Sequence, residues 1–211
     1  MGSMPPPTIA RNLRISAKSM FGFSTLGVAM SLFYTGKGDK GSSVVGKKKI
    51  KKTNPFVEAL GELDELNSMT GILKADNIRP ELRKVLHQIQ ENLFIVQASL
   101  AYAMLREKRQ PPAFSVHKTS EAEKIIDAIE KKLKPTKGFV ISGSTRVSAW
   151  LDMLRARSRK VEMSVLKINN LKLKIQGSIL PYLNRLSSLF FALARDDAFR
   201  AKKKELHPTY K

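Results

Sequence analysis

The amino-acid sequence predicts an all-α protein, an up-and-down bundle of about five helices. In several long segments apolar residues recur every three or four positions, which is the spacing of one helix face. Short stretches rich in glycine, proline and polar residues separate these segments. No alternation of apolar and polar residues persists beyond a few positions, and 211 residues suit one domain with a substantial core.

The first helix is predicted over about residues 54–74. Thr53 or Asn54 can cap its amino end, and Pro55 stands where a first-turn proline is tolerated. The apolar positions that follow have helical spacing, so three glutamates are expected to point mostly outward: Glu58, Glu62 and Glu65.

Four further helices follow from the same spacing. We expect them over residues 80–106, 120–133, 145–167 and 178–201, with Ser144 or Thr145 as the cap of the fourth. Residues 36–53 are rich in glycine, lysine and serine and predict a loop or irregular arm. Residues 135–143 and 168–177 are expected to be connectors.

Three regions organise the chain. Residues 1–33 form a leader, residues 34–201 form the bundle, and residues 202–211 form a charged tail that we expect to be mobile. The leader is basic, contains serine and has no acidic residue, which is typical of a transit peptide. Translation from an upstream start, with Met30 as the true start, explains it equally. The expected location is the cytoplasm, or the mitochondrial matrix if the leader is a transit peptide.

The formal charge of +20 indicates a polyanionic partner, such as a nucleotide's phosphates, a nucleic acid or an acidic membrane surface. Lysines that serve only to keep the protein surface soluble explain the positive charge as well. Aromatic residues do not interleave with the lysines at 47–52 or 202–204, so a stacking platform for single-stranded nucleic acid is missing. The absence of cysteine excludes disulfides, thiolate nucleophiles and zinc–sulfur sites.

Two patterns suggest chemistry. Arg155, Arg159 and Glu162 have the spacing of one helix face beside the buried one, and arginine suits phosphate. Residues 34–43 combine glycines and lysines, which can cradle an anion, although the Walker spacing is missing. A solvated, salt-bridged helix face and a flexible basic arm explain the two patterns without a ligand.

Other constellations carry little chemistry. The histidines, His87, His117 and His207, lack partners at metal-ligand spacing, and no metal-ligating residues are predicted. Ser142 lacks the surroundings of a nucleophile elbow. Asp64 and Glu65 could serve as acid and base, but exposed helix carboxylates are the ordinary outcome.

Four segments follow one another in a recognisable order: YTGKGDKGSS at 34–43, KTNPFVEALGELDELNS at 52–68, RARSRKVE at 155–162 and YLNRLSSLFFALAR at 182–195. Taken together and in this order, they resemble the PduO-type ATP:cob(I)alamin adenosyltransferases, and the likeness covers nearly everything from about residue 33 to 197.

The resemblance implies a homotrimer with ATP and cobalamin bound between subunits. Such enzymes transfer the 5′-deoxyadenosyl group of ATP, with Mg²⁺ on the phosphates, to cob(I)alamin and release triphosphate. A cob(II)alamin reductase and an adenosylcobalamin-dependent enzyme are implied partners, whereas nucleic acid and membrane are not.

The resemblance also implies residue roles. Asp64 would pair with Arg155 across the interface, Arg159 would reach phosphate with support from Glu162, and Asn184 would contact the nucleotide. Phe139 matches the aromatic that displaces the lower axial ligand of cobalamin; an ordinary hydrophobic cap on the fourth helix is the alternative. The remaining residues would wrap the ATP phosphates: Thr35, Gly38, Asp39, Lys40, Gly41, Ser42 and Lys52.

The chain departs from the family pattern mainly on the corrin side. Residues 141–144 read Ile-Ser-Gly-Ser where the family has Leu-Pro-Gly-Gly, Lys160 and Met163 replace arginines, and Gly36 replaces a larger residue. The alternative function is therefore a non-catalytic bundle that binds nucleotide or RNA.

Overall fold

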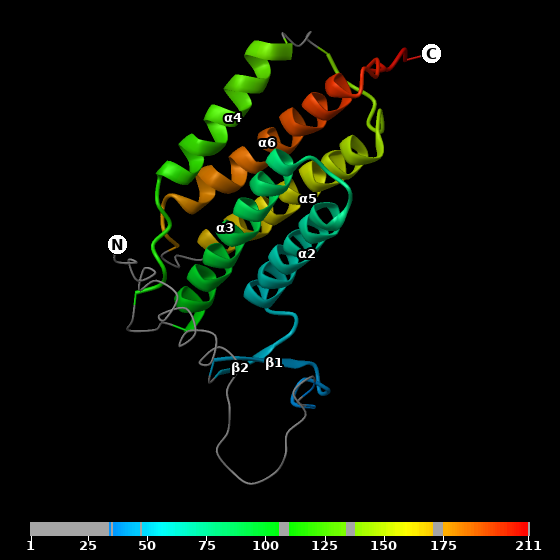
Figure 1. Cartoon of the computed structure of the whole chain (residues 1–211). Helices are drawn as coiled ribbons and strands as arrows, with labels where there is room; N and C mark the ends of the chain where they lie inside the picture. Colours follow the sequence, from blue (N-terminus) through cyan, green and yellow to red (C-terminus); the bar gives the residue numbers. More distant parts are fainter. Residues whose placement is uncertain are drawn as a thin grey trace, which may run out of the picture.

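The computed structural model describes residues 34, 36–46, 48–105, 110–133, 138–170 and 175–210. Its described part contains five helices, so the predicted all-α bundle is confirmed (Figure 1). They are α2 (Pro55–Ala75), α3 (Pro80–Leu105), α4 (His117–Leu133), α5 (Arg146–Asn169) and α6 (Ile179–Arg200). The predicted leader, residues 1–33, lies outside the described residues.

Successive helices run in alternating directions, and α5 lies at the centre of the packing (Figure 1). It packs against both α2 and α6, while α3 packs on α2 and α4 packs on α6. Of the α4 residues only Ala122 is fully buried, so α4 is an outer helix on a core made by the other four. None of the described helices is long and apolar enough to cross a membrane.

The helix boundaries follow from local caps. Asn54 Oδ1 accepts the Phe56 amide at 3.0 Å, and Pro55 occupies the first turn, as predicted. Thr145 and Ser148 form a reciprocal capping box at the start of α5. The prediction for α4 was three residues short, because Ser115 Oγ accepts the His117 amide and starts the helix there.

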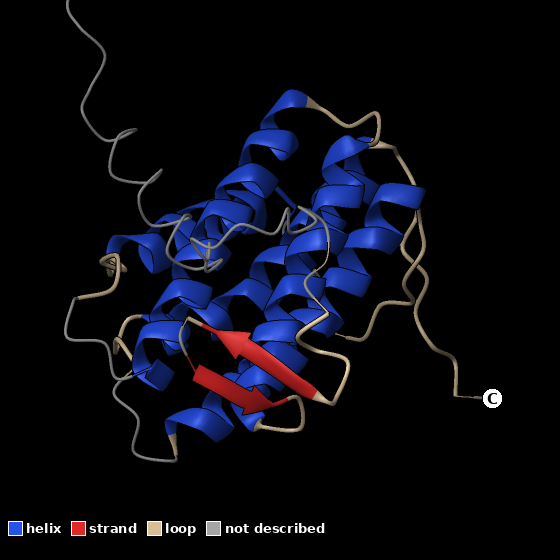
Figure 2. Cartoon of the chain, turned by 90° about the horizontal axis from the view of Figure 1, so that it is seen from below, coloured by secondary structure: helices blue, strands red, loops and turns tan. Residues whose placement is uncertain are grey.

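The prediction of an irregular arm over residues 36–53 was wrong. Strands β1 (Ser42–Val45) and β2 (Lys48–Lys51) pair antiparallel, with Ser42 opposite Lys51. Gly46, at φ +58°, starts the turn, and a Cβ there would lie 2.8 Å from Leu105 Cδ1. The hairpin therefore rests against the end of α3, at the end of the bundle where α2 begins (Figures 1 and 2).

The charged tail is not a free end. Beyond α6 the chain turns back, and the Ile141 amide donates to the Leu206 carbonyl at 2.7 Å, in an isolated antiparallel bridge. The tail and the connector before α5 consequently lie side by side, although they are 65 positions apart in sequence (Figure 1).

Near the end of α6, Asp196 is a buried carboxylate that joins three elements. It contacts Arg79 before α3 at 2.6 Å, Lys132 of α4 at 2.7 Å and Arg200 of α6 at 2.8 Å. Burial alone would raise the pKa of Asp196, but hydrogen bonds from Lys132 and Arg200 and the charge of Arg79 outweigh it and lower that pKa.

A lowered pKa in the folded state predicts acid sensitivity. The stabilisation from Asp196 is present above the carboxyl's unfolded pKa of about 3.9 and is lost as the pH falls through the folded value. Asp196→Asn should therefore reduce the free energy of unfolding at pH 7 and flatten its decline below about pH 4. Urea unfolding from pH 7 to pH 2 measures both. The exposed Asp127→Asn is the control; a decline in Asp196→Asn as steep as in the wild type would contradict the prediction.

Candidate functional site

The arm, residues 36–53 with the β1–β2 hairpin, brings together several residues that the sequence predicts to bind phosphate. The Gly41 amide donates to the Gly38 carbonyl at 3.2 Å, and the Lys52 amide donates to the Gly41 carbonyl at 3.0 Å. A Cβ on Gly38 would lie 3.5 Å from Lys52 Nζ, so the ammonium group lies over that glycine. The turn thus holds the backbone of Gly38 and the ammonium group of Lys52 close together.

The rest of the arm is accessible. Asp39, Lys40 and Gly41 are exposed, and Ser42 is half-buried at the start of β1. Thr35 lies outside the described residues. Lys48 Nζ donates to the Leu105 carbonyl at 3.1 Å, so one lysine anchors the arm to the carboxyl end of α3. The arm is therefore a fixed basic edge of the bundle.

The predicted face of α5 extends onto α6. Asn184 Nδ2 donates to Glu162 Oε1 at 2.8 Å, which joins two predicted site residues from different helices. Arg159 is exposed one turn before Glu162 and has no ion pair or side-chain hydrogen bond with any described residue. Its guanidinium is available to a ligand.

Asp64 and Arg155 are not paired within one chain. Asp64 is exposed on α2, whereas Arg155 Nε lies 3.5 Å from Asp152 Oδ1 on its own helix. Their pairing across an interface stays a prediction.

The outward direction predicted for Glu62 was wrong. Glu62 is buried and contacts Arg157 of α5, which also contacts Glu65, and Lys160 Nζ lies 3.1 Å from Glu62 Oε1. Glu62 lies on the side of α2 that faces α5, and its partner there is Arg157 rather than an apolar side chain. This ion-pair group fixes α2 against α5 beside Asp64 and Arg159.

Phe139 is not a hydrophobic cap on α5. The residue is 77% exposed, in the connector before the helix, and His207 Nδ1 lies 2.8 Å from the Phe139 carbonyl oxygen. The connector before α5, which carries Phe139, and the arm lie at opposite ends of the bundle (Figure 1). One chain alone therefore does not bring all the predicted site residues together.

Two buried charged residues were missed by the sequence reading. Asp152 and Arg195 form an ion pair at 2.8 Å, with side chains only 4% and 5% exposed. Their only signal in the sequence is a charge at a position that helical spacing assigns to the core.

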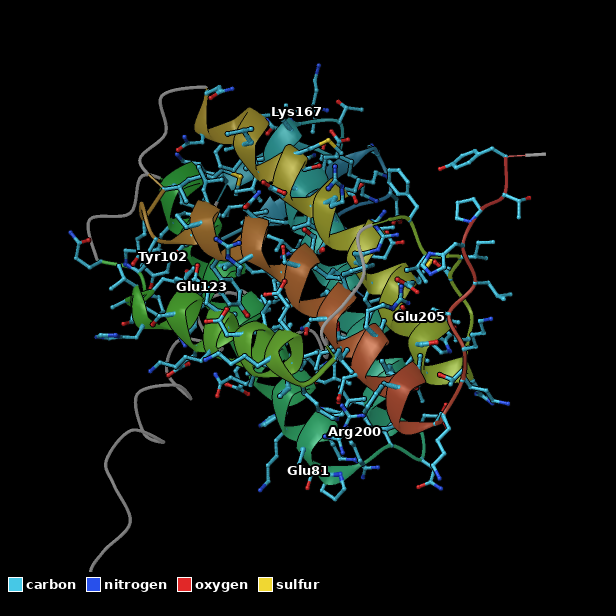
Figure 3. The ribbon with its side chains drawn as sticks, turned by 90° about the horizontal axis from the view of Figure 1, so that it is seen from above. Glu81, Tyr102, Glu123, Lys167, Arg200 and Glu205 are labelled. Atoms are coloured by element: carbon cyan, nitrogen blue, oxygen red, sulfur yellow. The ribbon has the colours of Figure 1, made fainter. Side chains whose placement is uncertain are left out.

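A hollow of about 390 Å³ lies elsewhere, between α3, α4 and α6. Six apolar and six charged side chains line it, and two of the charged ones, Glu81 and Arg200, lie on the same side of the bundle (Figure 3). None of the predicted site residues lines it. Among the described residues, no group of three or more histidines and carboxylates is placed to hold a metal ion.

Comparison with known proteins identifies the family. Residues 33–196 match the family model described as cobalamin adenosyltransferase. The chain belongs to the cobalamin adenosyltransferase family. This member is 33% identical over 167 residues to the corrinoid adenosyltransferase of Citrobacter freundii, covering 79% of this chain and 94% of that protein. It is 33% identical over 166 residues to that of Bacillus subtilis, covering 77% and 84% of the two chains.

Solved structures of the family have the same fold. A phenylalanine-to-alanine variant of the PduO-type ATP:corrinoid adenosyltransferase from Lactobacillus reuteri, complexed with cobalamin and ATP, superposes with a TM-score of 0.78. It is 29% identical and covers 84% of this chain and 99% of its own. The adenosyltransferase PduO of Citrobacter freundii is longer, and this family member spans 48% of it at 29% identity. The predicted family is thus confirmed, while the roles of individual residues stay predictions.

The contacts of Arg157 predict its effect on stability. Arg157→Ala leaves Glu62 buried with Lys160 alone, and breaking a buried pair in this way costs about 3 kcal/mol. Urea unfolding measures the loss. Arg185→Ala is the matched control, because the Arg185–Glu123 pair is half-exposed, far more than Glu62, and contributes at most about 1 kcal/mol. Equal losses of the free energy of unfolding in the two variants would contradict the stabilising role of Arg157.

Proposed function

We propose that this protein transfers the 5′-deoxyadenosyl group of ATP to cob(I)alamin. Cobalt supplies an electron pair, the cobalt–C5′ bond forms, the C5′–oxygen bond breaks, and triphosphate leaves with the released pair. Membership of the cobalamin adenosyltransferase family is the observation that carries the proposal. Relatives named corrinoid adenosyltransferases, and a similar structure complexed with cobalamin and ATP, support it.

The chain's own groups suit the nucleotide half of this reaction. Because cobalt is the nucleophile, the protein supplies no attacking side chain and has to orient C5′ and stabilise the leaving charge. We assign the phosphates to the glycine turn at 38–41, Lys40 and Lys52 on the arm, and to Arg159 on α5. Glu162 and Asn184, already hydrogen-bonded to each other, would fix the nucleotide beside that arginine.

We propose that Mg²⁺ accompanies ATP and rests chiefly on phosphate oxygens. Asp39 is the only acidic residue in the arm between Tyr34 and Lys52, so the arm offers cations to the phosphates and one carboxylate to a metal ion. When bound, the ion would neutralise part of the triphosphate charge.

The active form proposed is a homotrimer whose sites lie between subunits. The arm lies at one end of the bundle, and the connector before α5, which carries Phe139, lies at the other (Figure 1). Arg159 is 13 residues into α5, roughly 20 Å along the helix from its start. A site that uses the arm, Arg159 and Phe139 together is complete only when a second copy supplies part of it. Asp64 and Arg155 would then pair across the interface.

On the corrin side, we propose that Phe139 displaces the lower axial ligand of cobalamin. Its exposed ring, in a connector tied to the tail, suits contact with a large apolar face. The location proposed is the cytoplasm, or the mitochondrial matrix if residues 1–33 are a transit peptide. A cob(II)alamin reductase and an adenosylcobalamin-dependent enzyme are the protein partners proposed.

Removal of Arg159 tests the reaction. Arg159→Ala should lower kcat/KM for ATP by roughly 100-fold or more, the loss expected when one charge-stabilising donor is removed. An anaerobic assay with ATP, Mg²⁺ and cob(I)alamin follows the absorbance change of the corrin. Arg83→Ala, on the exposed side of α3, is the matched control. Failure of the folded wild type to turn over would refute the proposed function.

Mixing two inactive variants tests the shared site. If Lys52 and Arg159 act from different subunits, unfolding and refolding Lys52→Ala with Arg159→Ala should restore about a quarter of the wild-type activity, since random assembly leaves that share of sites intact. Refolded wild type and each variant refolded alone are the controls. If both residues act from the same chain, the mixture stays inactive.

A further inference from the structure

Asp152 lies in the core of the bundle between two arginines. Its Oδ2 accepts from Arg195 Nη2 of α6 at 2.8 Å, and its Oδ1 lies 3.5 Å from Arg155 Nε, one turn further along α5. The Asp152 side chain is 4% exposed and the Arg155 side chain 35% exposed. One buried carboxylate thus connects the interior with the arginine on the proposed interface.

The contacts continue from Arg195 to the tail. Arg195 Nε lies 2.8 Å from Glu205 Oε1, an ion-pair contact whose two atoms make no hydrogen bond with a described residue. Figure 3 labels Glu205, in the tail beyond α6. The guanidinium of Arg195 lies over the Phe191 ring, 4.8 Å from its centre. Arg195 is therefore held on three sides, by one carboxylate from α5, one from the tail and an aromatic face.

From Glu205 the chain reaches the connector at its next two residues. The Leu206 carbonyl accepts the Ile141 amide at 2.7 Å, and His207 Nδ1 lies 2.8 Å from the Phe139 carbonyl oxygen. An unbroken series of contacts runs from Arg155 through Asp152, Arg195 and the tail to the backbone of Phe139.

A buried ion pair is a poor source of net stability, because desolvation offsets its attraction, but it specifies one arrangement of the groups around it. Neutralising Asp152 would leave Arg195 buried with Glu205 alone and Arg155 without its contact on α5. Neutralising Glu205 would loosen the tail from α6 and leave the Asp152 pair intact. The two carboxylates are therefore separable by mutation.

We propose that Asp152 is a positioning residue that orients Arg155 and, through Arg195 and Glu205, fixes the tail against the connector that carries Phe139. The proposal rests on the proposed function for its catalytic consequence only. The coupling between Asp152 and the connector is a property of the fold and can be measured without substrate.

Amide hydrogen exchange at Ile141 gives that readout, since this amide donates to the tail. Glu205→Gln should speed exchange at Ile141 by roughly tenfold, and Asp152→Asn should do the same through Arg195. The matched controls, Glu130→Gln and Asp127→Asn, change exposed carboxylates of α4 and should leave the rate unchanged. An unchanged rate in Glu205→Gln overturns the role of the tail. A change in Glu205→Gln with none in a folded Asp152→Asn overturns the coupling.

Kinetics test the catalytic consequence. Glu205→Gln should raise the KM for cobalamin by roughly tenfold while the KM for ATP stays within about twofold, because only the connector is released. Asp152→Asn should also lower kcat, and the double variant should lose less than the product of the single effects. Independent, multiplicative effects overturn the coupling. If Asp152→Asn does not fold, Glu205→Gln, at a side chain 31% exposed, carries both measurements. Absent turnover in the wild type would refute the proposed function and leave the exchange result standing.

Discussion

The packing of α5 between α2 and α6 is the constraint on which the rest of the structure depends. Leu151, Leu154, Val161 and Val165 of α5 are fully buried, so the rotation of this helix is fixed by apolar contact. A fixed rotation leaves Arg159 exposed and places Glu162 within reach of Asn184 on α6. The buried group of Glu62 and Arg157 adds a specific polar contact on the α2 side. The proposed site is therefore a consequence of how the core is packed.

The position of the arm and of Phe139 along the bundle matters as much as the rotation of α5. The basic arm is fastened to the end of α3 through Gly46, Lys48 and Leu105, whereas Phe139 is fastened to the tail at the far end. Neither group can approach the other within one chain without breaking these contacts. This separation is the physical reason for proposing a site shared between copies, in which a second chain would supply the missing end without a large movement of the first.

The sequence predicted the features that depend on periodicity and caps. Five helices, the caps at Asn54 and Thr145 and the shared face of Arg155, Arg159 and Glu162 all follow from short-range rules. The hairpin was missed because its two strands have four residues each and are rich in lysine and serine, so no alternation is visible. The burial of Glu62 and Asp152 was missed because it depends on arginines far away in sequence, Arg157 and Arg195.

The same long-range partners explain why the tail had no visible role in the sequence. Apart from Leu206, residues 202–207 are charged or polar, a composition that by itself favours a mobile end. Glu205 has an ordered position because a buried arginine lies within 2.8 Å, and that arginine is itself oriented by Asp152. Once Glu205 is fixed, the next residue meets the connector, so the ion pair and the backbone bridge lie at successive residues of the tail. A charge in the core thus determines the order of a surface segment that lacks apolar residues of its own, apart from Leu206.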